Sequence, residues 1–149
     1  MNTQLKLGEH YLCELSQCDT VLLHDADSAI EVFFHAIHAS GLTVLAESSH
    51  KFAPHGFSAF TLLAESHASV HAWPEYGYCA IDVFTCNLRL DLEPLFRRLQ
   101  QDFRAANMKL ELVDRSARWD GPIADRPGPA EVVENAQWSP ALPAEVFYD

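Results

Sequence analysis

The order of two hydrophobic periodicities along the chain most constrains its fold. Apolar residues recur at helical spacing in residues 28–39 and 92–106. Six other short segments have the apolar, alternating character of strands: residues 10–15, 42–46, 57–64, 68–73, 78–85 and 108–113. Most of these strands follow one another through short turns. This order predicts the α+β class, as a two-layer α/β sandwich with a mainly antiparallel sheet and two helices on one face.

Residues at the ends of the helical segments support these boundaries. Asp25 or Asp27 can cap the first helix, and Gly41 can end it. Asp91 can cap the second helix, with Pro94 in its first turn. Both segments therefore have the start signals that amphipathic helices need.

Polar, proline and glycine residues predict where regular structure stops. Residues 47–56 are expected to form a polar loop, and the polar interruption at Glu65, Ser66 and His67 is expected to form a hairpin turn. After residue 115 the chain is rich in proline, glycine and alanine. We therefore expect one domain over residues 1–115 and a C-terminal tail over residues 116–149.

Composition restricts the classes of partner. The 149 residues are 48% hydrophobic, too apolar for a disordered chain, yet no apolar run is long enough to span a bilayer. A net charge of −11 disfavours nucleic acid and anionic membranes. The first seven residues do not have the pattern of a secretory signal, so a cytoplasmic location is expected. In that compartment the four cysteines are expected to be free thiols: Cys13, Cys18, Cys79 and Cys86. Their spacings do not match a zinc site, so no metal site is predicted.

One stretch, residues 65–86, carries residue types that suggest chemistry. Ser66 is a potential nucleophile, His71 a potential base and Cys86 a potential proton donor, all expected near one hairpin end. The same pattern is typical of a capped turn beside a packed histidine, and a buried cysteine commonly only packs. The residue types alone leave both interpretations open.

This stretch resembles the processing motif of the small prokaryotic S-adenosylmethionine decarboxylase proenzymes. Three parts of it match: Glu65-Ser66-His67, then His71-Ala72-Trp73-Pro74-Glu75-Tyr76-Gly77-Tyr78, then Asp82-Val83-Phe84-Thr85-Cys86. Two further segments also resemble the family: Leu7-Gly8-Glu9-His10, and His50-Lys51-Phe52 with Pro54, Gly56 and Ser58. The order of helices and strands agrees with the family through about residue 115.

The resemblance implies that the chain cuts itself between Glu65 and Ser66. The serine hydroxyl would attack the preceding carbonyl carbon, and elimination would leave a β chain of residues 1–65 and an α chain that begins with a pyruvoyl group derived from Ser66. Ser58 and His71 match the family positions that assist this processing. A strand hydroxyl and a packed histidine are their alternative interpretations.

The resemblance also implies the residues of catalysis. The pyruvoyl cofactor would form a Schiff base with the substrate amine, and Cys86 matches the family's proton donor. Phe52 and Trp73 match positions whose rings can hold a sulfonium and an adenine, and Glu75 matches a partner for ribose hydroxyls. Core packing for the two rings, and a solvated turn for the carboxylate, are the alternatives.

The implied enzyme is a pyruvoyl-dependent carboxy-lyase that converts S-adenosylmethionine to the aminopropyl donor for spermidine and polyamine biosynthesis. The family further implies a homodimer with active sites close to the subunit interface. Ala68 and Ala72 are smaller than the residues expected beside the site. Two alternatives therefore stay open: a pyruvoyl-dependent decarboxylase of ornithine or arginine, and a non-processing, non-catalytic paralogue that binds a metabolite.

Overall fold

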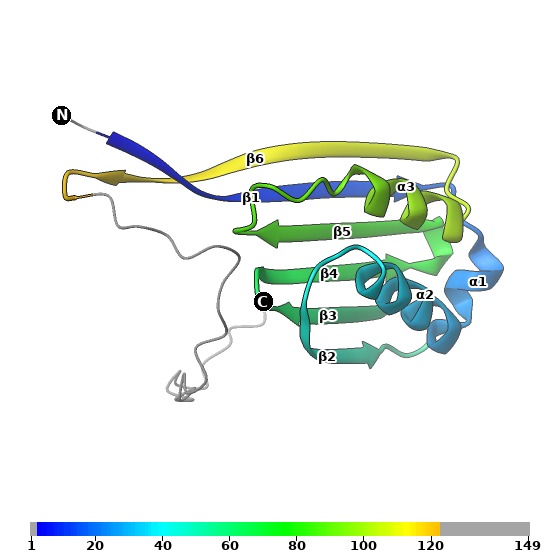
Figure 1. Cartoon of the computed structure of the whole chain (residues 1–149). Coiled ribbons are helices and arrows are strands. Elements are labelled where there is room, and N and C mark those ends of the chain that lie inside the picture. Colours follow the sequence, from blue (N-terminus) through cyan, green and yellow to red (C-terminus); the bar gives the residue numbers. More distant parts are fainter. Residues whose placement is uncertain (1–2, 123–149) are drawn as a thin grey trace, which may run out of the picture.

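The computed structural model describes residues 3–122, and within them six antiparallel strands form one sheet in the order β2-β3-β4-β5-β1-β6 (Figure 1). The strands are β1 (Thr3–Ser16), β2 (Val44–Lys51), β3 (Phe57–Leu63), β4 (Ser66–Trp73), β5 (Tyr78–Thr85) and β6 (Asn107–Trp119). The helices are α1 (Thr20–His24), α2 (Ala26–His38) and α3 (Glu93–Asp102). A 3-10 turn, Pro74–Tyr76, joins β4 to β5.

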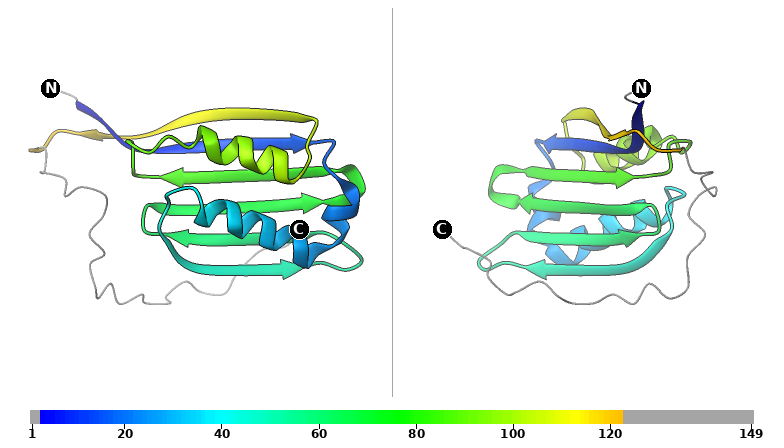
Figure 2. Two further views of the ribbon diagram at one scale, coloured as in Figure 1. Left: turned by 45° about the vertical axis from the view of Figure 1, so that its right-hand side comes forward. Right: turned by 90° about the vertical axis from the view of Figure 1, so that its left-hand side faces the viewer.

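The predicted two-layer sandwich is confirmed: α2 and α3 lie over one face of the sheet (Figure 2). α2 begins where its cap was predicted, since Oδ1 of Asp25 accepts a hydrogen bond from the Ser28 amide at 3.3 Å. Before α3, the Asp91 carboxylate accepts from the Glu93 amide at 3.0 Å. Asp25 is therefore the N-cap of α2, as predicted. The N-cap of α3 is Leu92, whose side chain makes no capping bond, so the predicted cap at Asp91 lies one residue too early.

Several elements differ from the predictions: β1 begins at Thr3 and not at residue 10, and α3 ends at Asp102 and not at residue 106. β2 runs on to Lys51 through most of the expected polar loop, because its pairing with β3 satisfies the backbone of those polar residues. α1 was not predicted; Asp19 caps it by accepting from the amides of Val21 and Leu22. β6 passes residue 115 and reaches Trp119, because β1 is longer than predicted and pairs with it along its length. Most of the expected tail, residues 123–149, lies outside the described residues.

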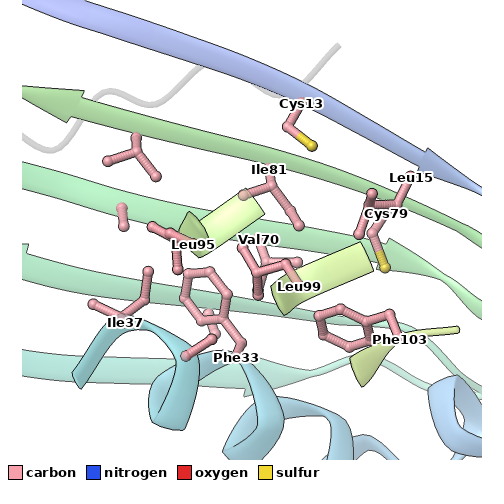
Figure 3. Close-up of a cluster of buried hydrophobic side chains, with 14 of the residues drawn as sticks. Cys13, Leu15, Phe33, Ile37, Val70, Cys79, Ile81, Leu95, Leu99 and Phe103 are labelled. Carbon is pink, nitrogen blue, oxygen red and sulfur yellow. The ribbon is translucent and has the colours of Figure 1, made fainter. Parts of the chain in front are cut away.

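The core lies between the sheet and the two longer helices (Figure 3). Side chains alternate along β5, so that Cys79, Ile81 and Val83 are buried toward the helices. Phe33 of α2 and Phe103 after α3 are fully buried against this face. Burying each such phenylalanine contributes about 1.5–3 kcal/mol relative to leaving it exposed. This packing fixes the sheet that carries the site.

Three of the four thiols lie in this core. Cys13, Cys18 and Cys79 are buried, and all four cysteines of the chain are free. Burial raises the pKa of Cys13 to about 12, so its thiol stays protonated at neutral pH. Cys86 is exposed just beyond the end of β5. Among residues 3–122, every helix is too short or too polar to cross a membrane.

The opposite face of the sheet, here called the open face, has no helix over it within the described chain (Figure 2). The strand registers place alternate residues of neighbouring strands side by side on it. Its centre combines polar and aromatic side chains: His10, Ser58, Phe60, His67, Ser69, His71, Asp82 and Phe84. The charged and polar groups with potential chemistry therefore lie opposite the core.

Candidate active site

The turn between β3 and β4 is clamped to the start of β2. Glu65 is only 5% exposed, and its carboxylate accepts hydrogen bonds from the amide of Thr43 at 3.1 and 3.2 Å and from the Thr43 hydroxyl at 3.0 Å. The Ala64 amide in turn donates to the Thr43 carbonyl at 2.9 Å. These bonds satisfy a buried carboxylate, and they hold the turn in one conformation.

Ser66 has a strained backbone. Its φ is 149°, in a region that residues other than glycine rarely adopt. Such a conformation costs on the order of 1–3 kcal/mol and persists only where surrounding contacts enforce it. The strained bond is next to the Glu65–Ser66 peptide, which is the bond that the sequence resemblance marks for cleavage.

The end of β5 meets this same peptide. The amide of Cys86 donates a hydrogen bond to the Glu65 carbonyl oxygen at 2.9 Å, and Thr85 is the register partner of Ser66. A backbone N–H therefore faces the oxygen that would gain charge if the carbonyl carbon were attacked. Sequence reasoning missed this donor because an amide has no residue-type signal; only the pairing of β4 with β5 brings it there.

A polar network, here called the His67–Asp82 network, begins at Ser66 and runs across the open face. The hydroxyl of Ser66 lies 3.4 Å from Nδ1 of His67, and Nε2 of His67 lies 3.0 Å from Oδ2 of Asp82. Ser69 donates to the other Asp82 oxygen, and Nε2 of His10 lies 2.6 Å from Oδ2. Burial alone would raise the pKa of Asp82, but these hydrogen bonds outweigh it and lower the pKa below its ordinary value.

Three members of this network, His10, His67 and Asp82, have one potential metal-ligand atom each within 4.8 Å of one another. Nη1 of Arg115 lies 3.1 Å from Nδ1 of His10. Arginine only donates, so this Nδ1 accepts and the proton of the neutral His10 ring is on Nε2, which donates to Asp82. An Nε2 that carries a proton has no lone pair for a metal. The donor set fits a hydrogen-bonded network and not a metal centre.

The other predicted residues line a hollow of about 420 Å³ at a different place on the sheet. Its walls include all of the following: Phe52, Ser58, His71, Trp73 and Glu75. Within it, the Ser58 hydroxyl lies 2.7 Å from Nδ1 of His71, and Nε2 of His55 lies 3.2 Å from Oε2 of Glu75. The structure therefore brings together the predicted substrate set and the two residues predicted to assist processing.

A tight turn before β3 shapes this hollow. The Phe52 amide donates to the Gly56 carbonyl at 2.8 Å, which folds the chain back between them. Gly56 has a φ of +98°, and a Cβ there would lie 3.2 Å from the Ala72 carbonyl oxygen. A glycine is needed for both reasons. The turn places Phe52 beside the end of β4 that carries Trp73.

The two groups of residues do not meet within one chain. Ser66 and His71 are five positions apart on β4, which at roughly 3.3 Å per residue separates their backbones by about 16 Å. Cys86 lies beside Ser66, as expected, but His71 does not lie at that hairpin end. The serine with its cysteine and the hollow with its histidine form two half-sites on one molecule.

Known proteins are similar to this chain over the residues that form both half-sites. The family model described as S-adenosylmethionine decarboxylase matches residues 9–116, which include both half-sites. The S-adenosylmethionine decarboxylase proenzyme of Pyrococcus abyssi is 37% identical over 114 residues, covering 76% of this chain and 82% of the relative. The proenzyme of Thermotoga maritima is 34% identical over 128 residues, covering 85% of this chain and 98% of the relative.

A solved structure has the same fold. The adenosylmethionine decarboxylase of Aquifex aeolicus superposes with a TM-score of 0.68 at 25% identity, over 83% of this chain and 98% of that one. The match by sequence and the match by structure each extend over most of the described chain. This chain therefore belongs to the S-adenosylmethionine decarboxylase family.

Proposed function

We propose that the protein is a self-processing, pyruvoyl-dependent decarboxylase of S-adenosylmethionine, whose product is the aminopropyl donor for spermidine synthesis. The family membership and the proenzyme names of its relatives support this function. One structural observation carries the proposal: the Glu65–Ser66 peptide is strained at Ser66, while the amide of Cys86, just past the end of β5, donates to its carbonyl oxygen.

The residues around this peptide fit a cofactor made from the serine. Attack of the Ser66 hydroxyl on the Glu65 carbonyl carbon forms a C–O bond and breaks the C–N bond, which converts the amide to an ester and releases the strain at φ. The Cys86 amide faces the oxygen on which charge develops. Loss of the Ser66 α-proton then breaks the Oγ–Cβ bond, leaving Glu65 as the new carboxyl terminus and residue 66 as dehydroalanine. This enamine tautomerises to an imine, and water hydrolyses the imine to the pyruvoyl carbonyl with release of ammonia.

In turnover, the pyruvoyl group would supply a carbonyl that condenses with the substrate amine and accepts the electron pair released with carbon dioxide. The chain must then return a proton to the substrate. We assign this role to the thiol of Cys86, which is exposed next to residue 66 and is the only cysteine of the four outside the core.

The hollow supplies a binding surface of matching chemistry. Phe52 and Trp73 are 50% and 41% exposed, so their ring faces are available to an adenine and to a sulfonium. The carboxylate of Glu75 can accept hydrogen bonds from ribose hydroxyls. Ala72, which is buried in the core, also borders the hollow.

A homodimer would join the two half-sites. The open face exposes Phe60 and Leu62 on β3 and Val113 on β6 by 43%, 45% and 42%, and a second copy packed on this face would cover them. If two open faces pack together, the hollow of one copy can lie beside Ser66 of the other. His71 would then assist processing in the partner chain.

We also place the enzyme in the cytoplasm, where a reducing environment keeps buried thiols such as Cys13 and Cys79 free.

Release of labelled carbon dioxide tests the substrate. We expect release from carboxyl-labelled S-adenosylmethionine and none from arginine or ornithine, the alternatives that the sequence left open. The Ser66→Ala variant serves as the control, since it keeps the hollow but cannot form the cofactor. Release from ornithine or arginine alone would contradict the proposed substrate. A chain that never cleaves would instead favour the non-processing alternative.

A further inference from the structure

We propose that His67, oriented by Asp82, is the base that takes the hydroxyl proton of Ser66 in the first step of self-cleavage. The inference rests on the proposed self-processing and adds a residue to it. His67 is part of the matching motif Glu65-Ser66-His67, but the family resemblance implies no role for it. The proposal separates the two proton removals of processing, one from the Ser66 hydroxyl and one from its α-carbon.

The distances favour this histidine for the first removal. Nδ1 of His67 lies 3.4 Å from the Ser66 hydroxyl oxygen, a separation that a small rotation of the serine side chain shortens to a normal hydrogen bond. His71 of the same chain is about 16 Å along β4, and Nδ1 of its ring is engaged with Ser58. Within one chain, His67 is therefore the histidine beside the nucleophile.

The hydrogen bonds also fix which ring nitrogen is free to accept. Asp82 is an ionised carboxylate that accepts from Ser69 and from the Nε2 proton of His10, whose other nitrogen accepts from Arg115. The remaining contact of Asp82 is Nε2 of His67, so this nitrogen carries the proton. Nδ1 of His67 is therefore unprotonated, and its lone pair can accept the proton of the Ser66 hydroxyl, which lies next to it.

This arrangement has the roles of a serine, histidine and aspartate triad. The carboxylate fixes the tautomer of the imidazole and stabilises the imidazolium that forms. Packing fixes the ring plane as well: Phe60 stacks on His67 with centroids 5.6 Å apart and planes 19° apart, and Phe84 lies 6.0 Å from it on another side. The base is thus preorganised by β1, β3 and β5 together.

The proton balance needs no additional reactant. As the Ser66 oxygen bonds to the Glu65 carbonyl carbon, its proton moves to Nδ1 of His67. When the C–N bond breaks, the same proton moves from Nδ1 to the Ser66 nitrogen, which becomes an amine. The shift is an isomerisation of the chain, and His67 returns to its starting state before the later elimination.

Cell-free synthesis of the full chain, followed by a chase and denaturing electrophoresis, measures the cleavage rate. A general base contributes about 10²–10⁴-fold, so we expect cleavage of His67→Ala to slow by at least about 10²-fold, and imidazole in the chase to restore part of it. Asp82→Asn should also slow cleavage, without imidazole rescue. His38→Ala, which changes an exposed histidine on α2, should cleave at the wild-type rate.

Hydroxylamine separates the two steps, because it cleaves esters and not peptide bonds. His67→Ala should stay uncleaved in hydroxylamine, since no ester forms, whereas His71→Ala should accumulate an ester that hydroxylamine cuts. Wild-type cleavage in His67→Ala, or an ester accumulating in it, would overturn the proposal and leave self-processing intact. Slow cleavage without imidazole rescue in both His67→Ala and His67→Gln would also overturn it, in favour of a structural role. Failure of the wild-type chain to cleave would contradict the proposed function itself.

Discussion

Substitution of Ser66 by glycine and by alanine measures the strain stored beside the Glu65–Ser66 peptide. Neither variant has a hydroxyl, so both stay uncleaved and can be compared as full-length chains. Alanine keeps a Cβ at a φ of 149°, where the conformation costs on the order of 1–3 kcal/mol, whereas glycine adopts it freely. Glycine also loses about 0.5–1 kcal/mol through its greater freedom in the unfolded chain.

With the middle of each range, about 2 kcal/mol of strain against about 0.75 kcal/mol of lost freedom, Ser66→Gly is predicted to be more stable than Ser66→Ala by about 1 kcal/mol. With a urea dependence of about 2 kcal/mol per molar, this difference raises the unfolding midpoint by roughly 0.6 M. Urea unfolding followed by circular dichroism, at one protein concentration for both variants, measures it. An alanine variant as stable as the glycine variant, or more stable, would refute the claim of strain at this peptide.

Four further predictions concern the two half-sites and the network between them. Cys86→Ala should still cleave, because the backbone amide remains, but turnover should fall by about 10²-fold or more; unchanged turnover would remove the thiol from the mechanism. Co-synthesis of tagged Ser66→Ala and His71→Ala chains should cleave the His71→Ala chain, and lack of cleavage in an isolated mixed dimer would contradict sharing of the site between copies. Glu75→Gln should raise KM for S-adenosylmethionine with little change in kcat; an unchanged KM would exclude the carboxylate from substrate binding. The folded state lowers the pKa of Asp82, so the contribution of this carboxylate to stability is present above its ordinary pKa of about 4 and is lost as the pH falls below that value. The Ser66→Ala variant should therefore lose more stability between pH 5 and pH 3 than the double variant Ser66→Ala with Asp82→Asn. Equal losses in the two variants would contradict this.

The elements set by local patterns were predictable from the sequence. Alternation along residues 78–85, between a proline and glycine turn and a polar stretch, gives β5 with the predicted bounds. Helical spacing and an aspartate cap give α2 to within two residues at its start. β2 was predicted too short because its polar residues are held by pairing with β3, and a partner strand leaves no trace in the strand's own composition.

The candidate site was predictable as a set of residues but not as an arrangement. Phe52, Trp73 and Glu75 meet at one hollow, as expected of a substrate set. The distance between Ser66 and His71 could not be read from their spacing, since five residues are close in a turn and far apart in a strand. His67 and Asp82 are fifteen positions apart, and only the register of β4 with β5 brings them together.

Mass spectrometry of the purified protein under denaturing conditions tests the central claim most directly. We expect two chains, one ending in a free carboxylate at Glu65 and one beginning at residue 66 with a pyruvoyl group, which lacks the amine of a serine terminus. Reduction with borohydride should raise the mass of the second chain by about 2 Da, as expected for a ketone gaining two hydrogens. A single chain of the full 16.7 kDa, or a second chain that begins with an unmodified serine, would contradict it.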